Sequence, residues 1–479
     1  WGIDRMKSMI RERADWCISR QRRWGLPIPV FYCADCGKPV CTDETIEAVS
    51  RLFAEKGSNA WFEMDAADIL PRGFACPHCG KSTGFTKEED TLDGWFDSGS
   101  THFAAMKKDQ GFWPATMYLE GLDQYRGWFQ SSLLTAVGAF GEGAPFKECV
   151  THGWTVDGEG RAMHKSLGNG VDPADIFNEN GADILRLWAA SADYHADVRC
   201  SKAIFQQLSQ NYLKFRNTCK FMLDNLVDFD PAHLTKAEDM PVLDRWLITK
   251  LNELIEKVEQ SYNDYEFHII THAVNDFCVT TLSSFYLDIV KDRLYCEAAD
   301  SAERRSAQTA LYLTLSTLAK LFAPILAFTC DEIWLAMPHT AEDDARNVVL
   351  NDMNKSFTAY ALDAETMARW EHIIEVRTAV NGALEEARAA KVIGKSLEAD
   401  VHLTVPEGDV FLADENPAAL ADLFIVSKVE LTVGGELAVK VENAAGTKCP
   451  RCWKHSLTPN AEGLCPRCAE VVRHLPDLL

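Results

Sequence analysis

Residues 115–140 read ATMYLEGLDQYRGWFQSSLLTAVGAF, and FKECVTHGWTV follows at residues 146–156. Residues 115–123 and the second stretch are short, apolar and rich in residues that favour strands, whereas residues 124–140 are typical of a helix. The order strand, helix, strand predicts an α/β sheet with crossover helices. Ligands of such sheets bind beyond the carboxyl ends of the strands, so we expect LEGLDQ, at the end of the first strand, to face a binding crevice.

The loop GRAMHKSLGNG, at residues 160–170, comes after the second strand. A glycine at each end, few apolar residues and no helical or strand period predict a mobile surface loop. A lysine in such a loop, here Lys165, is most often merely solvated. Because this loop and LEGLDQ each come just after a strand, the sequence also allows both to face one crevice.

The chain has 479 residues, of which 47% are hydrophobic and 10% aromatic, enough for several domains with apolar cores. It has no signal peptide and no run of eighteen apolar residues, and it starts with Trp1 rather than Met, so we expect a soluble fragment of a longer protein. The net charge of −23 argues against indiscriminate nucleic-acid binding. Basic residues nevertheless gather in residues 5–23 and in the last thirty residues, either as local binding surfaces or as ordinary solvated faces.

Eight of the sixteen cysteines form four Cys-x-x-Cys pairs, which in a long chain without a secretion signal indicates metal binding in a reducing compartment. The last two pairs, with twelve residues between them, are Cys449 with Cys452 and Cys465 with Cys468. Two such knuckles complete a tetrahedral site of four thiolates, which predicts structural zinc. The surrounding thirty residues have too few large apolar groups to fold alone, so the metal would supply most of the folding free energy. A redox dithiol, the alternative, would not need two pairs.

The first two pairs are Cys33 with Cys36 and Cys76 with Cys79, and 39 residues separate them. They predict a second zinc site, in which Cys41 or His78 are alternative ligands. The triplet Gly-Lys-Ser that follows Cys79 resembles the end of a phosphate-binding loop. Such a loop needs a glycine five positions before its second glycine, where this chain has alanine, so we reject this interpretation.

After residue 205 the sequence becomes helical. An apolar stripe recurs at Leu243, Leu247, Leu251, Leu254 and Val258. Spacings of three and four residues are far more typical of a packed helix face than of a binding face. A second long helix is predicted over residues 267–295, a further helix over residues 370–390, and strands in SLEADVHLTV and VSKVELTV.

Five stretches resemble one family in sequence and in order. They are DWCISRQRRWGLPIP (15–29), LDGWFDSGSTHF (92–103), YLEGLDQYRGWFQSSLL (118–134), HGWTVDGEGRAMHKSLGN (152–169) and FHIITHAVNDFCVTTLSSFYLDIVKDRLYC (267–296). Together they resemble the second half of the bacterial isoleucine–tRNA ligases, a family of class I aminoacyl-tRNA synthetases. The resemblance extends over nearly the whole chain and includes the four-cysteine tail.

The resemblance implies a domain organisation. We expect part of a Rossmann-like catalytic domain at residues 1–204 with a zinc-knuckle insertion at 33–90, a helical anticodon-binding domain at 205–355, a helix and small α+β unit at 356–445, and a zinc ribbon at 446–479. The first half of the nucleotide fold, with its His-Ile-Gly-His signature, and the editing domain are expected to lie outside this chain.

The resemblance also implies the activity. Such an enzyme activates isoleucine with ATP and Mg2+ to isoleucyl-adenylate and transfers it to tRNA(Ile), as a cytoplasmic monomer without membrane attachment. The bundle would read the anticodon loop, and the basic ribbon would bind backbone phosphates. The alternative is a catalytically inactive, synthetase-derived fragment that binds tRNA.

Members of this family have a Lys-Met-Ser-Lys-Ser loop that closes over ATP. In this chain the AMHKS segment, residues 162–166, takes the place of that loop. A cation brought to the phosphates as charge develops on them lowers the barrier without over-stabilising bound ATP. By resemblance Lys165 is that cation and Ser166 a supporting donor. The family's first lysine and first serine are replaced by Ala162 and His164, so we expect Lys165 to act alone or with help from Arg161.

The sequence LEGLDQ matches the adenylate-binding segment of the family. By resemblance Glu120 holds the α-ammonium of the amino acid, and Gly121 lets the backbone approach the nucleotide. Asp123 and Gln124 have groups suited to ribose hydroxyls and backbone polar atoms. Without the resemblance, an acidic turn is more often a solvated cap.

By the same resemblance, Trp95 and Trp128 form the walls of the isoleucine side-chain pocket, whereas core packing is the ordinary role of a tryptophan. A hydrophobic pocket discriminates weakly against a side chain lacking one methylene, and the isoleucine enzymes are the known example in which hydrolytic editing corrects this.

Overall fold

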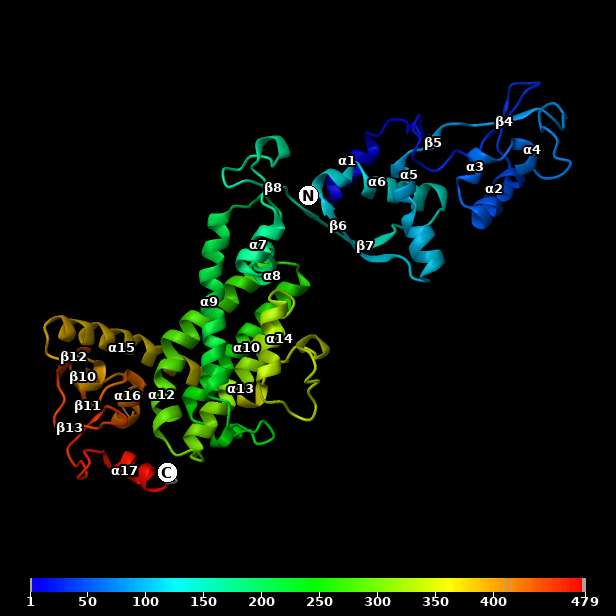
Figure 1. Cartoon of the computed structure of the whole chain (residues 1–479). Helices are drawn as coiled ribbons and strands as arrows, with labels where there is room; N and C mark the ends of the chain where they lie inside the picture. Colours follow the sequence, from blue (N-terminus) through cyan, green and yellow to red (C-terminus); the bar gives the residue numbers. More distant parts are fainter. Residues whose placement is uncertain (1, 410, 414, 476–479) are drawn as a thin grey trace. The chain divides into compact units, whose positions relative to one another are not determined.

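The computed structural model describes residues 2–409, 411–413 and 415–475 (Figure 1). The chain divides into two compact units. The first runs to Thr155 and includes Tyr194–Val198; the second comprises Val156–Asp193 and the chain from Arg199 onward. The loop at residues 160–170 therefore belongs to the same unit as the helical bundle.

The strand, helix and strand predicted at residues 115–156 are confirmed in the first unit. Strand β6 (Ala115–Gly121) pairs in parallel with β7 (Phe146–His152), and Gly121 lies opposite His152 at their carboxyl ends. Between them run α6 (Trp128–Leu133) and the π-helical segment η3 (Leu134–Ala139). Tyr118 of β6 and Phe129 of α6 are buried in a small core.

Short elements surround this pair of strands. They are α1 (Gly2–Arg11), β1 (Ser19–Arg20), β5 (Thr91–Leu92), α5 (Gly94–Gly99), η1 (His102–Asp109) and the 3-10 turn η2 (Leu122–Tyr125). Strands β1 and β5 pair antiparallel. Helix α5 packs against α6, the helix that follows the carboxyl end of β6.

The cysteine-containing insertion has a core of its own, formed around Phe31, Val49 and Trp61. Its elements are β2 (Phe31–Cys33), β3 (Pro39–Val40), α2 (Asp43–Lys56), α3 (Ala60–Glu63), α4 (Ala66–Ile69) and β4 (Phe85–Lys87). The strands form an antiparallel sheet in the order β3-β2-β4. Thr42 caps α2 by accepting a hydrogen bond from the Thr45 backbone N–H, which fixes where that helix begins.

The second unit begins with the loop and two short helices. Strand β8 (Thr155–Val156) pairs with β9 (Val198–Arg199), and the loop contains the 3-10 turn η4 (Lys165–Leu167). After the loop the chain forms two helices, α7 (Pro173–Asn180) and α8 (Ala182–Ser191). They separate at Gly181, whose φ of +86° is incompatible with a continuous helix.

The predicted bundle is confirmed. Its helical elements are α9 (Lys202–Asp224), α10 (Val242–Asn263), α11 (Phe267–Asp276), η6 (Phe277–Tyr286), α12 (Leu287–Cys296), α13 (Ala302–Phe322) and α14 (Ala327–Ala336), with the 3-10 turns η5 (Ala237–Asp239), η7 (Val348–Leu350) and η8 (Thr358–Tyr360). All five members of the leucine and valine stripe are buried on α10. The long helix predicted at residues 267–295 is continuous, with a π-helical middle, η6.

A buried carboxylate ties three bundle helices together. Asp244 of α10 is fully buried and accepts hydrogen bonds from the Tyr286 hydroxyl (2.7 Å) and the Ser306 hydroxyl (2.6 Å). The Arg293 guanidinium donates to both its oxygens, at 2.8 and 3.0 Å. Burial and the Asp244 charge raise the pKa of the Tyr286 hydroxyl well above its usual value, so this hydroxyl stays protonated and donates.

The predicted carboxyl-terminal helix and α+β unit are also confirmed. Their elements are α15 (Ala364–Ala389), the 3-10 turn η9 (Ser396–Glu398), β10 (Ala399–Val405), α16 (Pro417–Phe424), β11 (Lys428–Val433) and β12 (Ala438–Asn443). The sheet order is β11-β10-β12, with β10 parallel to β11 and antiparallel to β12. Alternate residues of β10 are buried, as a half-covered sheet requires.

The chain continues into a cysteine-rich segment with β13 (Thr447–Lys448), β14 (His455–Ser456) and α17 (Pro466–Arg473). Residues 476–479 of the predicted ribbon lie outside the described residues. Among the helices of the described part of the chain, none combines the length and the apolar character that a membrane span requires.

The Asp244 network generates a stability prediction. We expect Asp244→Asn to lower the free energy of unfolding of the bundle by about 3–5 kcal/mol, because it leaves the buried Arg293 charge without its counter-ion. Urea denaturation followed by circular dichroism measures the change. The matched control is Asp288→Asn, which removes an exposed partner of Lys291 and should cost less than about 1 kcal/mol. Equal costs for the two variants would contradict the assigned role of Asp244.

Candidate functional site

The carboxyl end of β6 carries four of the predicted site residues on one short turn: Glu120, Gly121, Asp123 and Gln124. The Gly121 N–H donates to the Glu120 carboxylate at 3.0 Å, and the Gln124 amide donates to Asp123 at 2.9 Å. A Cβ at Gly121 would lie 2.9 Å from an Asp123 carboxylate oxygen, so a side chain there would displace that carboxylate. The turn presents two carboxylates at the end of a parallel strand, where the sequence analysis predicted a ligand.

The two predicted pocket tryptophans both lie beside Gly127: the Trp95 ring approaches it, and Trp128 follows it in the chain. A Cβ at Gly127 would lie 2.8 Å from the Trp95 ring and 2.6 Å from the Gln124 amide oxygen, so glycine is what allows this approach. The same oxygen accepts a hydrogen bond from the Trp128 backbone N–H at 3.0 Å. The exposed fraction of Trp95 is 44%. Trp128 has one face stacked on Tyr118, with ring centroids 4.1 Å apart, so it serves partly as core.

In the second unit the loop at residues 160–170 is organised by Asp157, whose carboxylate accepts four hydrogen bonds. One oxygen accepts from the backbone N–H groups of Glu159 (3.0 Å) and Arg161 (2.9 Å). The other accepts from the Arg161 side chain and the Asn169 amide, both at 2.9 Å. The Asn169 amide first, and then Arg161, hold the pKa of Asp157 well below its usual value, so the carboxylate is charged.

Lys165 and Ser166 lie on the 3-10 turn η4, and their side chains are exposed. Arg161 is paired with Asp157 and, at 3.1 Å, with Glu159. Lys165, by contrast, forms no ion pair with any residue in the described part of the chain. Of the two cations in the loop, only Lys165 is therefore available to an incoming anion.

The sequence analysis missed Asp157 and Asn169. The sequence does contain a signal for both residues. Asp is followed by Gly at one end of the loop, and Asn lies between two glycines at the other. In such combinations the Asp or Asn side chain commonly stabilises a turn by bonding to the backbone. The predicted site residues divide between the two units. Those of LEGLDQ and the two tryptophans belong to the first, and Lys165 and Ser166 to the second.

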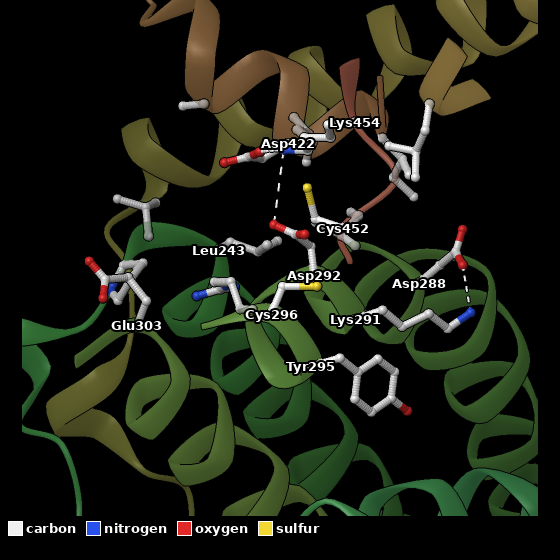
Figure 2. Close-up of a pocket in the computed structure, with 18 of the residues that line it drawn as sticks. Leu243, Asp288, Lys291, Asp292, Tyr295, Cys296, Glu303, Asp422, Cys452 and Lys454 are labelled. Carbon is white, nitrogen blue, oxygen red and sulfur yellow. Dashed lines mark hydrogen bonds and ion pairs between the residues drawn. The ribbon is translucent and has the colours of Figure 1, made fainter. Parts of the chain in front are cut away.

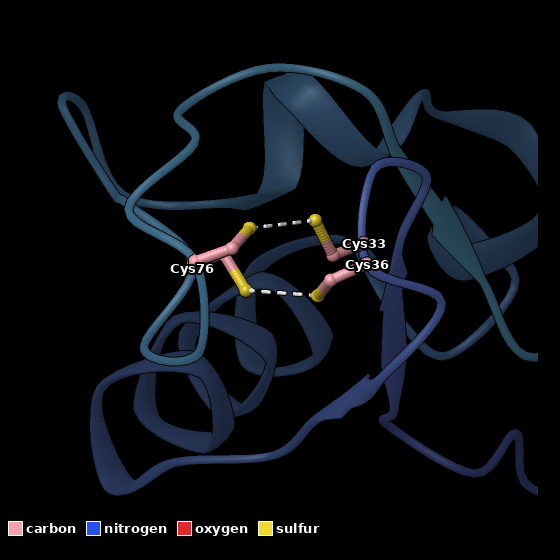
Figure 3. Close-up of side chains that lie close together, drawn as sticks. Cys33, Cys36 and Cys76 are labelled. Carbon is pink, nitrogen blue, oxygen red and sulfur yellow. Dashed lines mark hydrogen bonds between the residues drawn. The ribbon is translucent and has the colours of Figure 1, made fainter.

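The first cysteine cluster has the geometry of a four-thiolate metal site (Figure 3). The sulfur atoms of Cys33, Cys36, Cys76 and Cys79 lie within 4.8 Å of one another, with Cys33 to Cys79 at 3.6 Å and Cys36 to Cys76 at 3.8 Å. A tetrahedron with zinc–sulfur bonds of about 2.3 Å has edges of about 3.8 Å, whereas a disulfide would be about 2.05 Å. The cluster therefore fits a zinc ion.

The alternative ligands of the first cluster are not part of it. Cys41 is exposed and lies outside the group of four sulfur atoms. The His78 ring nitrogen faces the Pro39 carbonyl at 3.2 Å instead. Although burial acts to raise it, the backbone N–H groups of His78 and Cys79 lower the pKa of the Cys76 thiol, which favours the thiolate that a metal binds.

The second cluster brings together Cys449, Cys452, Cys465 and Cys468, with Cys452 and Cys465 sulfurs 3.7 Å apart. Although burial acts in the opposite direction, backbone N–H groups lower the pKa of the Cys449 thiol. The sulfur spacing again fits a zinc ion, held by four thiolates with no open position.

Three of the four knuckles share one backbone conformation. The residue after the second cysteine donates its N–H to the carbonyl of the first at 2.8–2.9 Å, and its φ lies between +67° and +77°. Gly37 and Gly80 take this position in the first cluster, but Trp453 takes it in the second. The Lys395 ammonium lies 5.0 Å from the centre of the Trp453 ring and partly covers it.

The basic residues of the ribbon are largely engaged within the chain. Arg467 pairs with Asp292 (2.6 Å) and Glu297 (2.8 Å). Lys448 pairs with Glu398, Lys454 with Asp422, and Arg473 with Glu470. Phosphate binding by these residues remains a prediction. In the structure Arg467, Lys448 and Lys454 attach the ribbon to the rest of the unit, whereas Arg473 pairs within the ribbon.

A cavity of about 910 Å³ lies where the bundle, α16 and the ribbon meet (Figure 2). Asp292 and Cys296 of α12 face Asp422 and Lys454 across it. Leu243, Tyr295, Trp370 and Trp453 contribute apolar surface to the same cavity.

Comparison with known proteins places these features in a family. Residues 1–201 match the family of class I tRNA synthetases (I, L, M and V), and residues 244–403 match the anticodon-binding domain of tRNA ligases. A ternary complex of the agnB2 LeuRS of Agrobacterium radiobacter K84 with tRNA and LeuAMS has a similar fold. Its TM-score is 0.55 at 18% identity, over 90% of this chain and 46% of that one.

Curated relatives match over nearly the whole chain. The isoleucine–tRNA ligase of Moorella thermoacetica is 48% identical over 99% of this chain and 53% of its own length. That of Carboxydothermus hydrogenoformans is 49% identical over 100% of this chain and 53% of its own length. The chain thus spans about half the length of the relatives it matches. The resemblance found in the sequence is confirmed: over nearly its whole length the chain is similar to isoleucine–tRNA ligases, and residues 1–201 match the class I tRNA synthetases.

Proposed function

We propose that this chain is the carboxyl-terminal part of an isoleucine–tRNA ligase, and that the full-length gene product activates isoleucine with ATP and transfers it to tRNA(Ile). The single observation that carries the proposal is Lys165, an exposed cation on a turn inside the AMHKS loop that forms an ion pair with none of the residues the structure describes. Binding of an anionic substrate such as ATP would give this lysine a function, whereas a lysine in an ordinary solvated loop has none. We expect the protein to act as a cytoplasmic monomer.

The proposed chemistry assigns a role to each group of residues. When the isoleucine carboxylate attacks the α-phosphate of ATP, negative charge grows on that phosphate and on the departing pyrophosphate. The Lys165 ammonium stabilises this charge, and the Ser166 hydroxyl donates to the same oxygens. Arg161 holds Asp157 instead of the phosphates, which is consistent with a single catalytic cation. Mg2+, bound with ATP, would neutralise phosphate charge.

The first unit would bind the amino acid and the adenylate. Glu120 would bind the α-ammonium of isoleucine, and Asp123 and Gln124 would bind ribose hydroxyls and backbone polar atoms. Trp95 and Trp128 would enclose the branched side chain of isoleucine. Such a pocket excludes larger side chains and discriminates weakly against valine.

The eight clustered cysteines would hold two zinc ions. Both sites are closed shells of four sulfur ligands, so zinc would stabilise the insertion and the ribbon and take no part in the chemistry. The helical bundle would bind the anticodon region of tRNA(Ile).

The decisive experiment is ATP–pyrophosphate exchange with isoleucine, valine or leucine. We expect the full-length gene product to catalyse isoleucine-dependent exchange and the 479-residue chain alone to catalyse none, because the first half of the nucleotide fold is expected outside it. A full-length product that binds tRNA but supports no exchange would establish the alternative, an inactive tRNA-binding protein.

The role of Lys165 can be tested in the full-length product. Lys165→Ala should lower kcat of the exchange reaction about 100- to 1000-fold, because it removes a group that stabilises charge in the transition state. Arg161→Ala is the matched control within the same loop and should lower kcat less than about tenfold, through the loss of its bond to Asp157. Similar losses for the two variants would overturn the assignment of Lys165 as the single cation.

Zinc binding can be tested on the 479-residue chain by mass spectrometry under native conditions. We expect two zinc ions per chain, and one in either Cys76→Ser or Cys468→Ser, because three thiolates no longer complete a tetrahedral site. Cys41→Ser and Cys296→Ser are matched controls: each removes a cysteine near one cluster that lies outside its four ligands. Loss of zinc from either control would show that the ligand set is wrong.

A further inference from the structure

We propose that Asn169 is a positioning residue: its side-chain amide, held by Asp157, sets the place of the backbone that carries the Lys165 ammonium. This inference rests on the proposed function of Lys165 and extends it to residues that the sequence analysis did not single out.

Asp157 is the fixed end of this arrangement. Strand β8 positions it, since the preceding residue Val156 is buried and accepts a hydrogen bond from the Cys200 N–H at 2.8 Å. Asp157 itself is 6% exposed. Its four hydrogen bonds fill both carboxylate oxygens, so its orientation is determined.

Asn169 connects that fixed carboxylate to the middle of the loop. Its amide nitrogen donates to Asp157 at 2.9 Å and to the Ala162 carbonyl at 3.1 Å. Its amide oxygen accepts from the His164 N–H at 3.0 Å. Three hydrogen bonds fix the plane of the amide. Two of them bind backbone groups of Ala162 and His164, immediately before Lys165.

Few other contacts hold this part of the loop. The side chains of residues 164–167 are exposed, and only Met163 packs against the small core around Ile176 and Phe205. The turn η4 is closed by two backbone hydrogen bonds, from the Leu167 N–H to the His164 carbonyl at 3.0 Å and from the Gly168 N–H to the Lys165 carbonyl at 3.3 Å. The position of Lys165 therefore depends on Asn169 more than on packing.

The chemistry of position 169 requires an amide. Asp157 is charged, so its partner must donate, and the His164 N–H requires an acceptor on the same side chain. An ionised carboxylate at position 169 would face Asp157 with like charge and would leave the Ala162 carbonyl without a donor. A protonated carboxyl group, however, can donate to Asp157 and accept from His164 at once.

This difference defines the test, which uses Asn169→Asp in the full-length gene product. At pH 8 we expect kcat of isoleucine-dependent exchange to fall about 10- to 100-fold, because the Lys165 ammonium is displaced from its position. The KM for isoleucine should change less than about twofold, because its proposed binding residues belong to the first unit. The ratio of variant to wild-type kcat should rise as the pH is lowered towards 6, because protonation of the new carboxyl group restores the bond to Asp157. His164, Glu159 and Arg161 are the same in both proteins, so taking the ratio of the two kcat values cancels their contribution.

Asn180→Asp is the matched control, because it makes the same replacement at the end of α7, where Asn180 bonds to Ser209 and not to the loop. Its kcat should equal that of the wild type. A pH-independent loss in Asn169→Asp, or no loss at all, overturns the proposal. If wild-type exchange is absent, or if Lys165→Ala retains it, the proposed function fails instead.

Trypsin cleavage after Lys165 provides a readout that does not depend on activity. In the Asn169→Asp variant at pH 8, cleavage at this bond should be at least about threefold faster than in the wild type, since release of the backbone lets the loop enter the protease. Equal cleavage rates would overturn the proposal whatever the enzymatic result.

Discussion

The contact between α8 and the turn that joins α13 to α14 is the constraint on which the second unit depends. Asp183 of α8 is buried and accepts hydrogen bonds from the Thr329 N–H at 2.8 Å and the Thr329 hydroxyl at 2.6 Å. Arg186, one turn later, donates to the carbonyls of Pro324 and Ile325. One helix thus caps the start of α14 with a carboxylate and the end of α13 with a guanidinium. Because α7 and α8 follow the loop directly, this contact fixes the base of the loop to the bundle.

Buried carboxylates that accept several hydrogen bonds occur at three places in the second unit. Asp157, Asp183 and Asp244 each accept three or more hydrogen bonds and lie almost or fully out of solvent. A buried carboxylate is costly unless donors surround it, and once surrounded it fixes their relative positions. The net charge of −23 therefore gives little information about ligands, since part of the acidic surplus serves internal structure.

Local sequence patterns were sufficient to predict the helices, strands and cysteine clusters. They were insufficient to predict the contacts between these elements. The stripe from Leu243 to Val258 is buried, the predicted strands of residues 115–156 pair in parallel, and the four Cys-x-x-Cys pairs come together as two groups of four sulfur atoms. The pairing of Arg467 with Asp292 joins residues 175 positions apart, and no periodicity encodes it. The same limit applies to Asn169 and Asp157, because a turn signal shows that a side chain bonds locally but not to which atoms.

The two CPRC motifs of the ribbon show how metal binding and domain attachment depend on each other. Arg451 and Arg467 take the same place in their knuckles, directly before the second cysteine. Arg451 donates to the carbonyls of Tyr295 and Cys296, which are the last of α12 and have no partner within that helix. Arg467 pairs with Asp292 on the preceding turn. Since each arginine is bonded directly to a ligand cysteine along the chain, a metal that fixes the four sulfur atoms also fixes both guanidinium groups at the end of α12. These polar contacts, together with the small apolar cluster that includes Cys296 and Leu464, attach the ribbon, so its thirty residues need little apolar surface of their own.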